Sequence, residues 1–370
     1  MGKYSSAQIA LTGHPDRVCD IIADAVLDAY IEDNSEVSVD IGVMLTKDIV
    51  ILAGETSNKP GFSVDEIVRN TLKSIGYTNE AFGLDAYKVD IEKHFKKQSQ
   101  DIARGVNSTE QKAQGAGDTT SVYGFATNEA PNCIPIALNI AWEIGHRMGE
   151  VRASEVIEGV GLDGKVQVIV EYEEERVKRL EAVIIAVQHL SGVDEEWFRM
   201  EIIENVVNVV CGDYIDENTK ILVNTAGRFV LGGPLVELGM SGTKMEMYTY
   251  GGFAKFGGNT FSGKDPYKID RTGSLIARKA AKYLVEQGIA DKCEIMINYA
   301  IGLVEPVLVD INTFDTGTLE DSEILNMLFE QFSFGTADII EDLDLLKPMY
   351  KDLSENGHFG RDELSWEDVV

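Results

Sequence analysis

The chain is organised around one glycine-rich, charged stretch, which reads Gly257-Gly258-Asn259-Thr260-Phe261-Ser262-Gly263-Lys264-Asp265-Pro266-Tyr267-Lys268-Ile269-Asp270-Arg271. It contains three glycines, two lysines, an arginine and two aspartates. Glycines let backbone N–H groups approach a phosphate closely, lysines supply positive charge, and a neighbouring carboxylate can hold Mg²⁺. The composition therefore suits a metal-bound polyphosphate. Taken alone, the stretch fits a glycine-rich loop before a charged helix start equally well.

The overall charge restricts what the protein can bind. The formal net charge is −29 at pH 7, so the mean electrostatic field repels nucleic acid and anionic membranes, and we expect neither as a partner. A polyphosphate site in such a chain must concentrate its cations locally. The cluster from Lys255 to Arg271 is therefore informative, and the length of 370 residues predicts about two or three domains.

Cysteine usage and hydropathy favour a cytoplasmic location. The four cysteines lie far apart and form no Cys-x-x-Cys pair, which indicates neither a zinc site nor a disulfide framework. The sequence has no run of about 18 apolar residues and no apolar signal core at its start. We therefore expect a protein that neither spans a membrane nor is secreted.

Hydrophobic periodicity predicts one order of elements three times: a helix, a strand pair and a second helix. The first pass has a helix after Asp16, strands at 37–45 and 49–53, and a helix that Ser63 caps and Gly76 ends. The second pass comprises a helix at 136–148, strands at 166–172 and 180–188, and a helix through 197–210. The third comprises a helix at 272–287, strands at 294–299 and 307–311, and a helix at 321–332.

This repeated order predicts the fold class. The hairpins begin near Val37, Val166 and Glu294, so the order recurs after roughly 130 residues, although few residues are identical between passes. We expect an α+β fold of three similar α+β units with pseudo-threefold symmetry, each a sheet covered on one face by helices. The predicted division is an N-terminal unit 1–101, a mobile loop and linker 102–118, a central unit 119–231 and a C-terminal unit 232–370.

The segment 98–118 is polar, contains glycines and shows little periodicity. Loops of this length inside compact proteins are usually functional or disordered. We interpret it as a lid over the active site, and the alternative is a simple linker.

A series of sequence blocks resembles the S-adenosylmethionine synthetase family, whose members are also called methionine adenosyltransferases. The blocks occur in family order over nearly the whole chain. They are Gly13-His14-Pro15-Asp16, Gly54-Glu55, Gln98-Ser99 with Asp101-Ile102, Gly115-Ala116-Gly117-Asp118, Asp163 with Lys165, Gly227-Arg228-Phe229 with Gly232-Gly233-Pro234, Thr249-Tyr250-Gly251-Gly252, Phe261-Ser262-Gly263-Lys264-Asp265-Pro266 with Lys268 and Asp270-Arg271, Tyr299-Ala300-Ile301-Gly302, and Gly357-His358-Phe359-Gly360-Arg361.

The resemblance implies a reaction and its requirements. The methionine sulfur attacks C5′ of ATP, expels tripolyphosphate, and the enzyme then cleaves that product to pyrophosphate and phosphate. The family also implies two Mg²⁺ per site, a stimulating K⁺, and a homodimer or homotetramer whose active sites lie between subunits. A thioether has no proton to lose, so the transfer needs no general base. Its main requirement is stabilisation of a highly charged leaving group.

The resemblance further implies the residues of the site. Phosphate contacts and catalysis are implied for His14, Lys165, Lys244 and Lys264, with His14 near the oxygen that leaves C5′. The implied metal carboxylates are Asp16 and Asp270. The implied methionine residues are Glu55, Gln98, Glu237 and Lys268. The implied nucleotide residues are Asp118, Asp163, Arg228, Phe229, Lys264, Lys268 and Ile301, with Phe229 stacked on adenine. Taken singly, His14, Asp16, Lys165 and Lys244 fit ordinary helix caps or solvated strand positions better. Their place within the matched blocks favours the functional interpretation.

Several positions depart from the family pattern, among them Gln8, where the family has a glutamate. Thr243 stands where the family has an arginine expected to bind the phosphates, and threonine cannot replace that charge. Arg17 and Arg104 are candidates to fill the space. Glu237 replaces an aspartate and is one methylene longer. The acidic residue expected to hold K⁺ aligns with Gly42, so we expect activity largely independent of K⁺.

These departures leave two alternatives to an active synthetase. The first is a degenerate paralogue that regulates a catalytic partner, for which Thr243 and Gly42 are the motive. The retained phosphate-contacting residues argue against it. The second is a tripolyphosphatase or another ATP-cleaving enzyme without alkyl transfer. Glu55, Gln98 and Glu237, the residues implied for the methionine end, argue against it.

Overall fold

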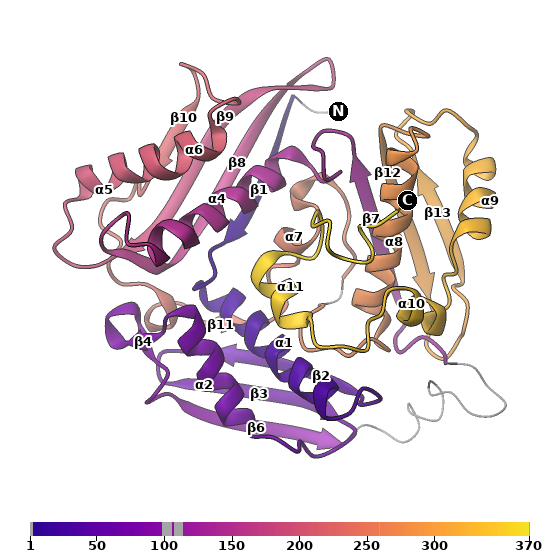
Figure 1. The fold of residues 1–370 in the computed structure, drawn as a ribbon, viewed down its shortest axis with the longest axis horizontal. Coiled ribbons are helices and arrows are strands. Elements are labelled where there is room, and N and C mark those ends of the chain that lie inside the picture. Colours follow the sequence, from indigo (N-terminus) through magenta and orange to yellow (C-terminus); the bar gives the residue numbers. More distant parts are fainter. Residues whose placement is uncertain (1–2, 98–105, 107–113, 259, 370) are drawn as a thin grey trace.

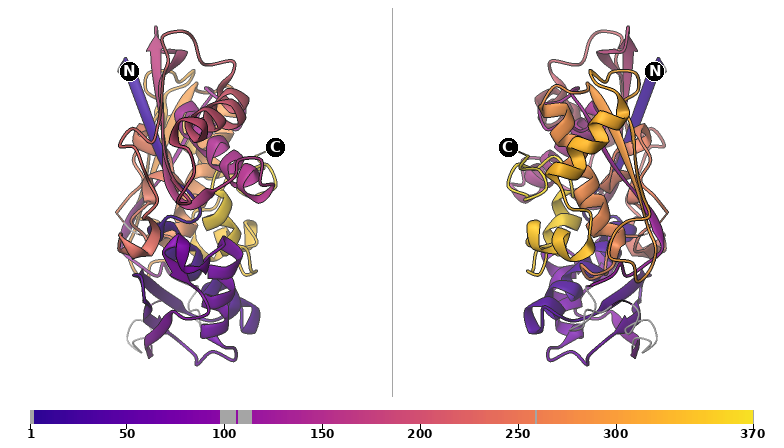
Figure 2. Two further views of the ribbon diagram at one scale, coloured as in Figure 1. Left: turned by 90° about the vertical axis from the view of Figure 1, so that its left-hand side faces the viewer. Right: turned by 90° about the vertical axis from the view of Figure 1, so that its right-hand side faces the viewer.

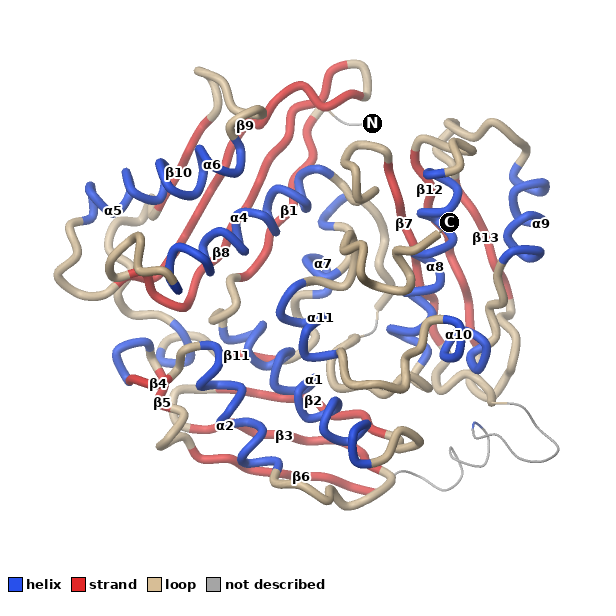
Figure 3. Tube along the Cα trace, viewed as in Figure 1, coloured by secondary structure: helices blue, strands red, loops and turns tan. Residues whose placement is uncertain are grey.

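The computed structural model describes residues 3–97, 106, 114–258 and 260–369 (Figure 1). Three main sheets lie side by side within these described residues, and each carries helices on one face (Figures 1 and 3). Seen edge-on, the molecule is thin, with most helices towards one broad side and strands towards the other (Figure 2). The predicted α+β class with helix-covered sheets is confirmed.

The first sheet has the strand order β11-β2-β3-β6, with a parallel pairing only between β3 and β6. Its strands are β2 (Val39–Leu45), β3 (Ile49–Thr56), β6 (Asp90–Lys97) and β11 (Gly239–Met240). Helices α1 (Pro15–Asp33) and α2 (Val64–Ile75) carry its core residues. The predicted helices and hairpin are confirmed: Ser63 accepts the N–H of Glu66, and Gly76 ends α2 at a φ of 117°.

The second sheet has the order β1-β8-β9-β10, again with a parallel outer pair, β9 and β10. Its strands are β1 (Tyr4–Ala10), β8 (Val160–Glu173), β9 (Arg176–His189) and β10 (Lys220–Val223). Helix α4 (Ile136–Ala153) packs on it beside α5 (Glu195–Ile202), a π-helical turn at 203–207 and α6 (Asn208–Cys211). The strands extend beyond the predicted limits at both ends.

The third sheet has the antiparallel order β13-β12-β7. Its strands are β7 (Thr120–Thr127), β12 (Lys292–Tyr299) and β13 (Leu308–Asn312), and its helices are α8 (Ile269–Glu286) and α9 (Asp321–Gln331). The C-terminal region adds α10 (Thr336–Asp342) and α11 (Tyr350–Asn356), which pack on α8 and α1. The remaining short elements are β4 (Thr78–Asn79), β5 (Leu84–Asp85) and α7 (Met245–Tyr248).

Each main sheet takes one strand from a distant part of the chain. β1 pairs with β8, β7 pairs with β12, and β11 pairs with β2. Local periodicity carries no information about such pairings, which join residues more than 100 positions apart in the sequence. The division at 101, 118 and 231 stays a prediction, and every sheet includes a strand from outside its own predicted range.

A buried ion pair ties the C-terminal segment to the core. The Arg278 guanidinium on α8 donates to both carboxylate oxygens of Glu367, at 3.0 and 2.9 Å. Lys282 donates to the backbone oxygen of Glu367 at 2.7 Å. Among the described residues, no helix has the length and apolar character needed to cross a bilayer.

Candidate active site

His14 caps the N-terminus of α1. Its Nδ1 accepts a hydrogen bond from the N–H of Asp16 at 3.2 Å, and Pro15 fills the first helical position, where no N–H is needed. Because Nδ1 is the acceptor, a neutral ring carries its proton on Nε2. That nitrogen has no hydrogen-bond partner within the described part of the chain. Burial, with the charge of Lys165, lowers the pKa of His14 to about 3, so the ring is neutral at pH 7.

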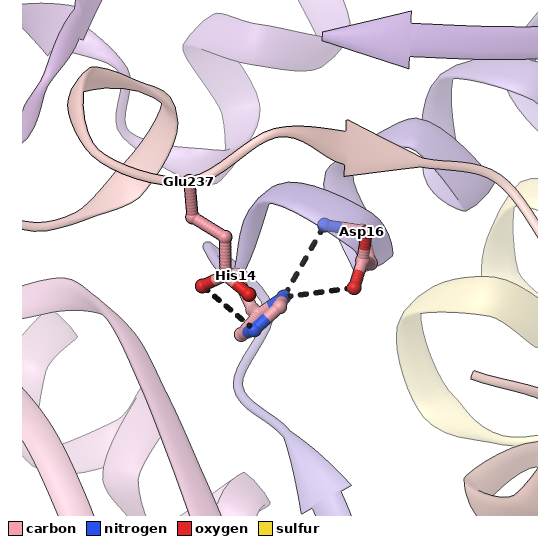
Figure 4. A group of neighbouring side chains, drawn as sticks. All are labelled: His14, Asp16 and Glu237. Carbon is pink, nitrogen blue, oxygen red and sulfur yellow. Dashed lines mark hydrogen bonds and ion pairs between the residues drawn. The ribbon is translucent and has the colours of Figure 1, made fainter. Parts of the chain in front are cut away.

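Glu237 reaches the same point from the loop after Gly233 (Figure 4). Its Oε2 lies 3.5 Å from His14 Nε2, and its Oε1 lies 3.6 Å from the Nζ of Lys165. Both contacts are longer than ordinary charge-assisted hydrogen bonds. An anionic ligand that binds His14 and Lys165 would have to displace this carboxylate.

Asp16 holds the loop that carries Lys244. Its Oδ1 accepts the N–H of Met240 at 2.8 Å, and its Oδ2 accepts a hydrogen bond from the Nζ of Lys244. Burial alone would raise the pKa of Asp16, but the hydrogen bonds from Lys244 and Met240 hold it below its usual value. Asp16 is therefore ionised at neutral pH and paired with Lys244, for which the family resemblance implies a phosphate contact.

A second set of charged side chains surrounds the start of α8. The Nζ of Lys264 donates to Asp270 Oδ2 at 2.7 Å, and residues 40 and 264 form an isolated strand-like bridge. Lys268 donates to Ser38 Oγ at 3.1 Å and lies 3.6 Å from Asp265 Oδ2. The glycine-rich stretch is thus folded against the beginning of β2.

The other predicted residues join one or the other of these sets. Asp163 is buried and accepts the N–H of Gly233 at 2.8 Å. A Cβ on Gly232 would lie 2.9 Å from the Phe229 ring and 3.2 Å from Asp163 Oδ2, so Phe229 and Asp163 flank one glycine. Arg228 is exposed beside Phe229.

Near the second set, Ile301 donates its N–H to Thr119 Oγ1 at 3.0 Å, next to Asp118. Glu55 is exposed and pairs across strands with Asp40. Gln98 and most of the predicted lid 102–118 lie outside the described residues.

The site residues therefore form two groups. The first group consists of His14, Asp16, Asp163, Lys165, Arg228, Phe229, Glu237 and Lys244. The second group consists of Glu55, Asp118, Lys264, Lys268, Asp270 and Ile301. The first group meets β2 where Met240 pairs with Met44, and the second meets it where Lys264 bridges Asp40. Asp40 and Met44 are four residue steps apart along β2, or about 13 Å at 3.3 Å per residue.

Two of the clefts that the described residues form are lined by other residues. One of about 820 Å³ is lined by 305–309 and 329–334. Another of about 730 Å³ is lined by residues that include Tyr4, Phe125 and Phe253. None of the predicted site residues lines either cleft.

His189 is a supporting residue that no sequence pattern indicates. Its Nε2 accepts the N–H of Phe229 at 3.1 Å, and its own N–H donates to the Phe229 carbonyl at 2.9 Å. These two bonds fix the backbone of Phe229 against β9. No local pattern marks this contact, since the two residues lie 40 positions apart.

Comparison with known proteins decides the family. Models of three S-adenosylmethionine synthetase domains match the chain in succession: the N-terminal domain at 3–100, the central domain at 113–229 and the C-terminal domain at 231–368. The chain belongs to the S-adenosylmethionine synthetase family. Its enzymatic function is that of a methionine adenosyltransferase.

Curated relatives match over nearly their full lengths. An S-adenosylmethionine synthase of Finegoldia magna is 39% identical over 376 residues, covering 98% of this chain and 96% of the relative. The corresponding protein of Clostridium tetani is 38% identical, covering 100% and 97%. That of Syntrophobacter fumaroxidans is 41% identical, covering 96% and 92%.

The residues of the synthetase site fit Mg²⁺. His14, Asp16 and Glu237 each offer a ligand atom, and these atoms lie within 4.8 Å of one another. Mg²⁺ prefers carboxylate oxygens and retains several waters, so Asp16 and Glu237 suit it, and so does the Asp270 carboxylate beside Lys264. His14 does not, because its Nδ1 already accepts a hydrogen bond and its Nε2 carries a proton.

The family's missing arginine has no substitute at Arg17. The Arg17 guanidinium is buried and donates to the carbonyls of Ala10, Ser354 and Glu355 at 2.6, 3.3 and 2.5 Å. It therefore cannot reach a phosphate, and this candidate is wrong. Thr243 is exposed and its hydroxyl donates to the Met240 carbonyl at 3.0 Å. Arg104 lies outside the described residues.

Gly42 leaves an open position on β2. It is exposed, and a Cβ built on it would meet only Ser241 Oγ at 3.8 Å and the Ala53 carbonyl at 3.9 Å. A longer side chain would fit there. Asp40 lies two residues away on the same strand face, where burial raises its pKa and the charges of Lys264 and Lys268 partly oppose that shift.

Proposed function

We propose that the two groups together transfer the adenosyl group of ATP to the methionine sulfur and then hydrolyse the tripolyphosphate to pyrophosphate and phosphate. The observation that carries this mechanism is the neutral, buried His14, whose Nε2–H has no hydrogen-bond partner within the described residues and lies 3.5 Å from the Glu237 carboxylate. Lys165 and the Asp16–Lys244 pair surround it. A fixed neutral donor amid cations suits an oxygen that gains negative charge as a bond breaks.

In this mechanism His14 donates its Nε2–H to the oxygen that leaves C5′. Lys165, Lys244 and Lys264 neutralise the phosphates, and no side chain needs to remove a proton from the thioether. Two Mg²⁺, held by Asp16 and Asp270, would supply further charge neutralisation and orient the polyphosphate. K⁺ has no acidic ligand at Gly42, so we propose that the enzyme works without it.

Each lysine of the proposed site is paired with a carboxylate. The pairs are Lys165 with Glu237, Lys244 with Asp16, Lys264 with Asp270 and Lys268 with Asp265. A polyphosphate that binds the lysines leaves the carboxylates beside new negative charge, and divalent cations relieve that repulsion. The pairing therefore supports joint binding of polyphosphate and Mg²⁺.

The remaining residues suit the two organic substrates. Acidic Glu55 and Glu237 favour the ammonium of methionine and the sulfonium of the product, together with Gln98, and Lys268 suits the methionine carboxylate. The nucleoside is assigned to Phe229 as the stacking surface and to Asp163 beside it. Asp118, Arg228 and Ile301 complete the nucleotide contacts.

We further propose a cytoplasmic homo-oligomer in which each site forms between two copies. The first and second groups of one chain lie at opposite ends of β2, so pairing with a partner's groups completes two sites. The outer face of this sheet carries half-buried Met44 and Ile51 and exposed Ala53, which a second copy would cover. The cysteines are all free and buried, as expected in a reducing compartment.

The direct test incubates the purified chain with ATP, methionine and Mg²⁺ and identifies the products by mass spectrometry. We expect S-adenosylmethionine, pyrophosphate and phosphate. Phosphate release without S-adenosylmethionine would indicate a tripolyphosphatase or another ATP-cleaving enzyme. Absence of both products would indicate a regulatory paralogue.

A further inference from the structure

Helix α1 carries aspartates at four-residue intervals, which we call the aspartate ladder: Asp16, Asp20, Asp24 and Asp28. This spacing places them on one face of the helix. Asp20 and Asp24 are fully buried. A buried carboxylate is destabilising unless hydrogen bonds satisfy it, so the partners of the ladder indicate what it holds.

The two buried carboxylates accept hydrogen bonds from the loops that carry the phosphate lysines. Asp20 Oδ1 accepts the N–H of Gly242 at 2.7 Å. Asp24 Oδ1 accepts the N–H of Gly263 at 2.8 Å and a guanidinium N–H of Arg271 at 2.6 Å. Gly242 precedes Lys244 by two positions, and Gly263 directly precedes Lys264.

Both glycines leave their loops little freedom. Gly242 and Gly263 have φ values of 79° and 77°, a region that favours glycine. A Cβ on Gly242 would lie 2.1 Å from Thr260 Cγ2, and one on Gly263 would lie 2.0 Å from the Ile41 carbonyl oxygen. The two loops therefore approach their neighbours closely while their N–H groups point to α1.

We propose that Asp20 and Asp24 are positioning residues, which fix Lys244 and Lys264 through the backbone N–H groups of Gly242 and Gly263. This inference rests on the proposed function, because it takes these lysines as phosphate contacts. Asp16 and Asp24 are eight helical residues apart, or about 12 Å. That distance is close to the separation of the two groups along β2. One helix, α1, therefore sets the positions of the loops that carry Lys244 and Lys264.

Asp28 provides a matched control on the same helix. It accepts the N–H groups of Met349, Tyr350 and Lys351 at 3.0, 2.9 and 2.8 Å, in a segment without predicted site residues. Burial raises the pKa of Asp28 to about 6 and that of Asp20 to about 7. Asp28 is half-buried and Asp20 fully buried, but removal of either carboxylate takes an acceptor away from backbone N–H groups, and of the two only Asp20 lies next to a phosphate loop.

The test measures calorimetric binding of inorganic tripolyphosphate with Mg²⁺ to the full chain, together with thermal stability. We expect Asp20→Ala to weaken binding about tenfold, and Asp20→Asn, which keeps an oxygen acceptor, to recover most of that loss. Asp28→Ala should lower stability comparably and leave binding unchanged. If Asp20→Ala does not fold, Asp20→Ser should weaken binding similarly, because its hydroxyl is too short to reach Gly242.

Two results would overturn the positioning role: unchanged binding in Asp20→Ala or Asp20→Ser, or an equal loss of binding in Asp28→Ala. Failure of the proposed function appears differently, because the unsubstituted chain would then neither bind tripolyphosphate nor form S-adenosylmethionine. That result would also remove the basis for the positioning role.

Discussion

The two groups of site residues differ in how firmly their charges are held. In the second group, the side chains of Lys264 and Asp270 are 12% and 1% exposed. In the first group, those of Lys165 and Glu237 are 40% and 43% exposed, with their charged atoms 3.6 Å apart. The Lys264–Asp270 pair of the second group is thus held in place, whereas the Glu237 carboxylate of the first group can move when an anion arrives. This difference suits a site in which the second group orients the polyphosphate, while Lys165 of the first group exchanges the Glu237 carboxylate for a phosphate during the reaction.

The largest expected difference between the groups concerns stability. Lys264→Ala removes the cation partner of buried Asp270 and should lower the free energy of unfolding by about 3 kcal/mol. Lys165→Ala breaks an open pair and should change it by less than about 1 kcal/mol. Urea unfolding of both variants measures the difference. Equal losses would show that the two groups are held alike.

The next effect concerns pH and His14. Its pKa is about 3 in the folded chain against 6.5 ordinarily, so between these values only the unfolded chain binds a proton there, and stability falls as pH falls. From pH 6.5 to 5 this contribution amounts to about 2 kcal/mol. His14→Asn, which can still cap α1, should lack it. The same dependence on pH in both proteins would mean that folded His14 titrates normally.

A smaller effect, on polyphosphate binding, is expected at position 243, where Thr243 replaces the family's arginine beside the first group. Thr243 is exposed and Arg17 is buried elsewhere, so Thr243→Arg should tighten binding of Mg²⁺-tripolyphosphate about fivefold, or roughly 1 kcal/mol. Thr243→Gln is the control, because it introduces a longer polar side chain without the positive charge of arginine. If Thr243→Arg gave no gain over the control, another cation would already fill this position.

The smallest effect is expected for K⁺. Because Gly42 supplies no carboxylate, replacing Na⁺ by K⁺ at constant ionic strength should change kcat by less than about twofold. Gly42→Glu should restore a response, since the position has room for a side chain. A several-fold stimulation of the unsubstituted enzyme would show that another acidic residue binds the ion.

The sequence predicted local elements and residue types better than their arrangement. The helix after Asp16, its neighbour capped by Ser63 and the first hairpin follow from periodicity and capping, which act within a few residues. The pairing of β1, β7 and β11 with distant strands could not be read from local pattern, because such contacts depend on the whole chain. The division of the site into two groups follows from those pairings, so it too became visible only in the structure.

The supporting contacts were equally hidden. The four-residue spacing of Asp20 and Asp24 is plain in the sequence, but it is also typical of an exposed acidic helix face. Only their burial against Gly242 and Gly263 distinguishes the two interpretations. His189 likewise has no distinguishing neighbours in the sequence and is identified by its bonds to Phe229.

The central claim is that each active site combines the first group of one chain with the second group of another. Complementation tests it most directly, using His14→Ala in the first group and Lys264→Gln, whose amide can still donate to Asp270, in the second. Each variant alone should be nearly inactive. After subunit exchange in an equal mixture, hybrid dimers should contain one site free of both substitutions and recover roughly a quarter of wild-type S-adenosylmethionine formation. Hybrids that form, as seen by native mass spectrometry, but stay inactive would contradict the shared site.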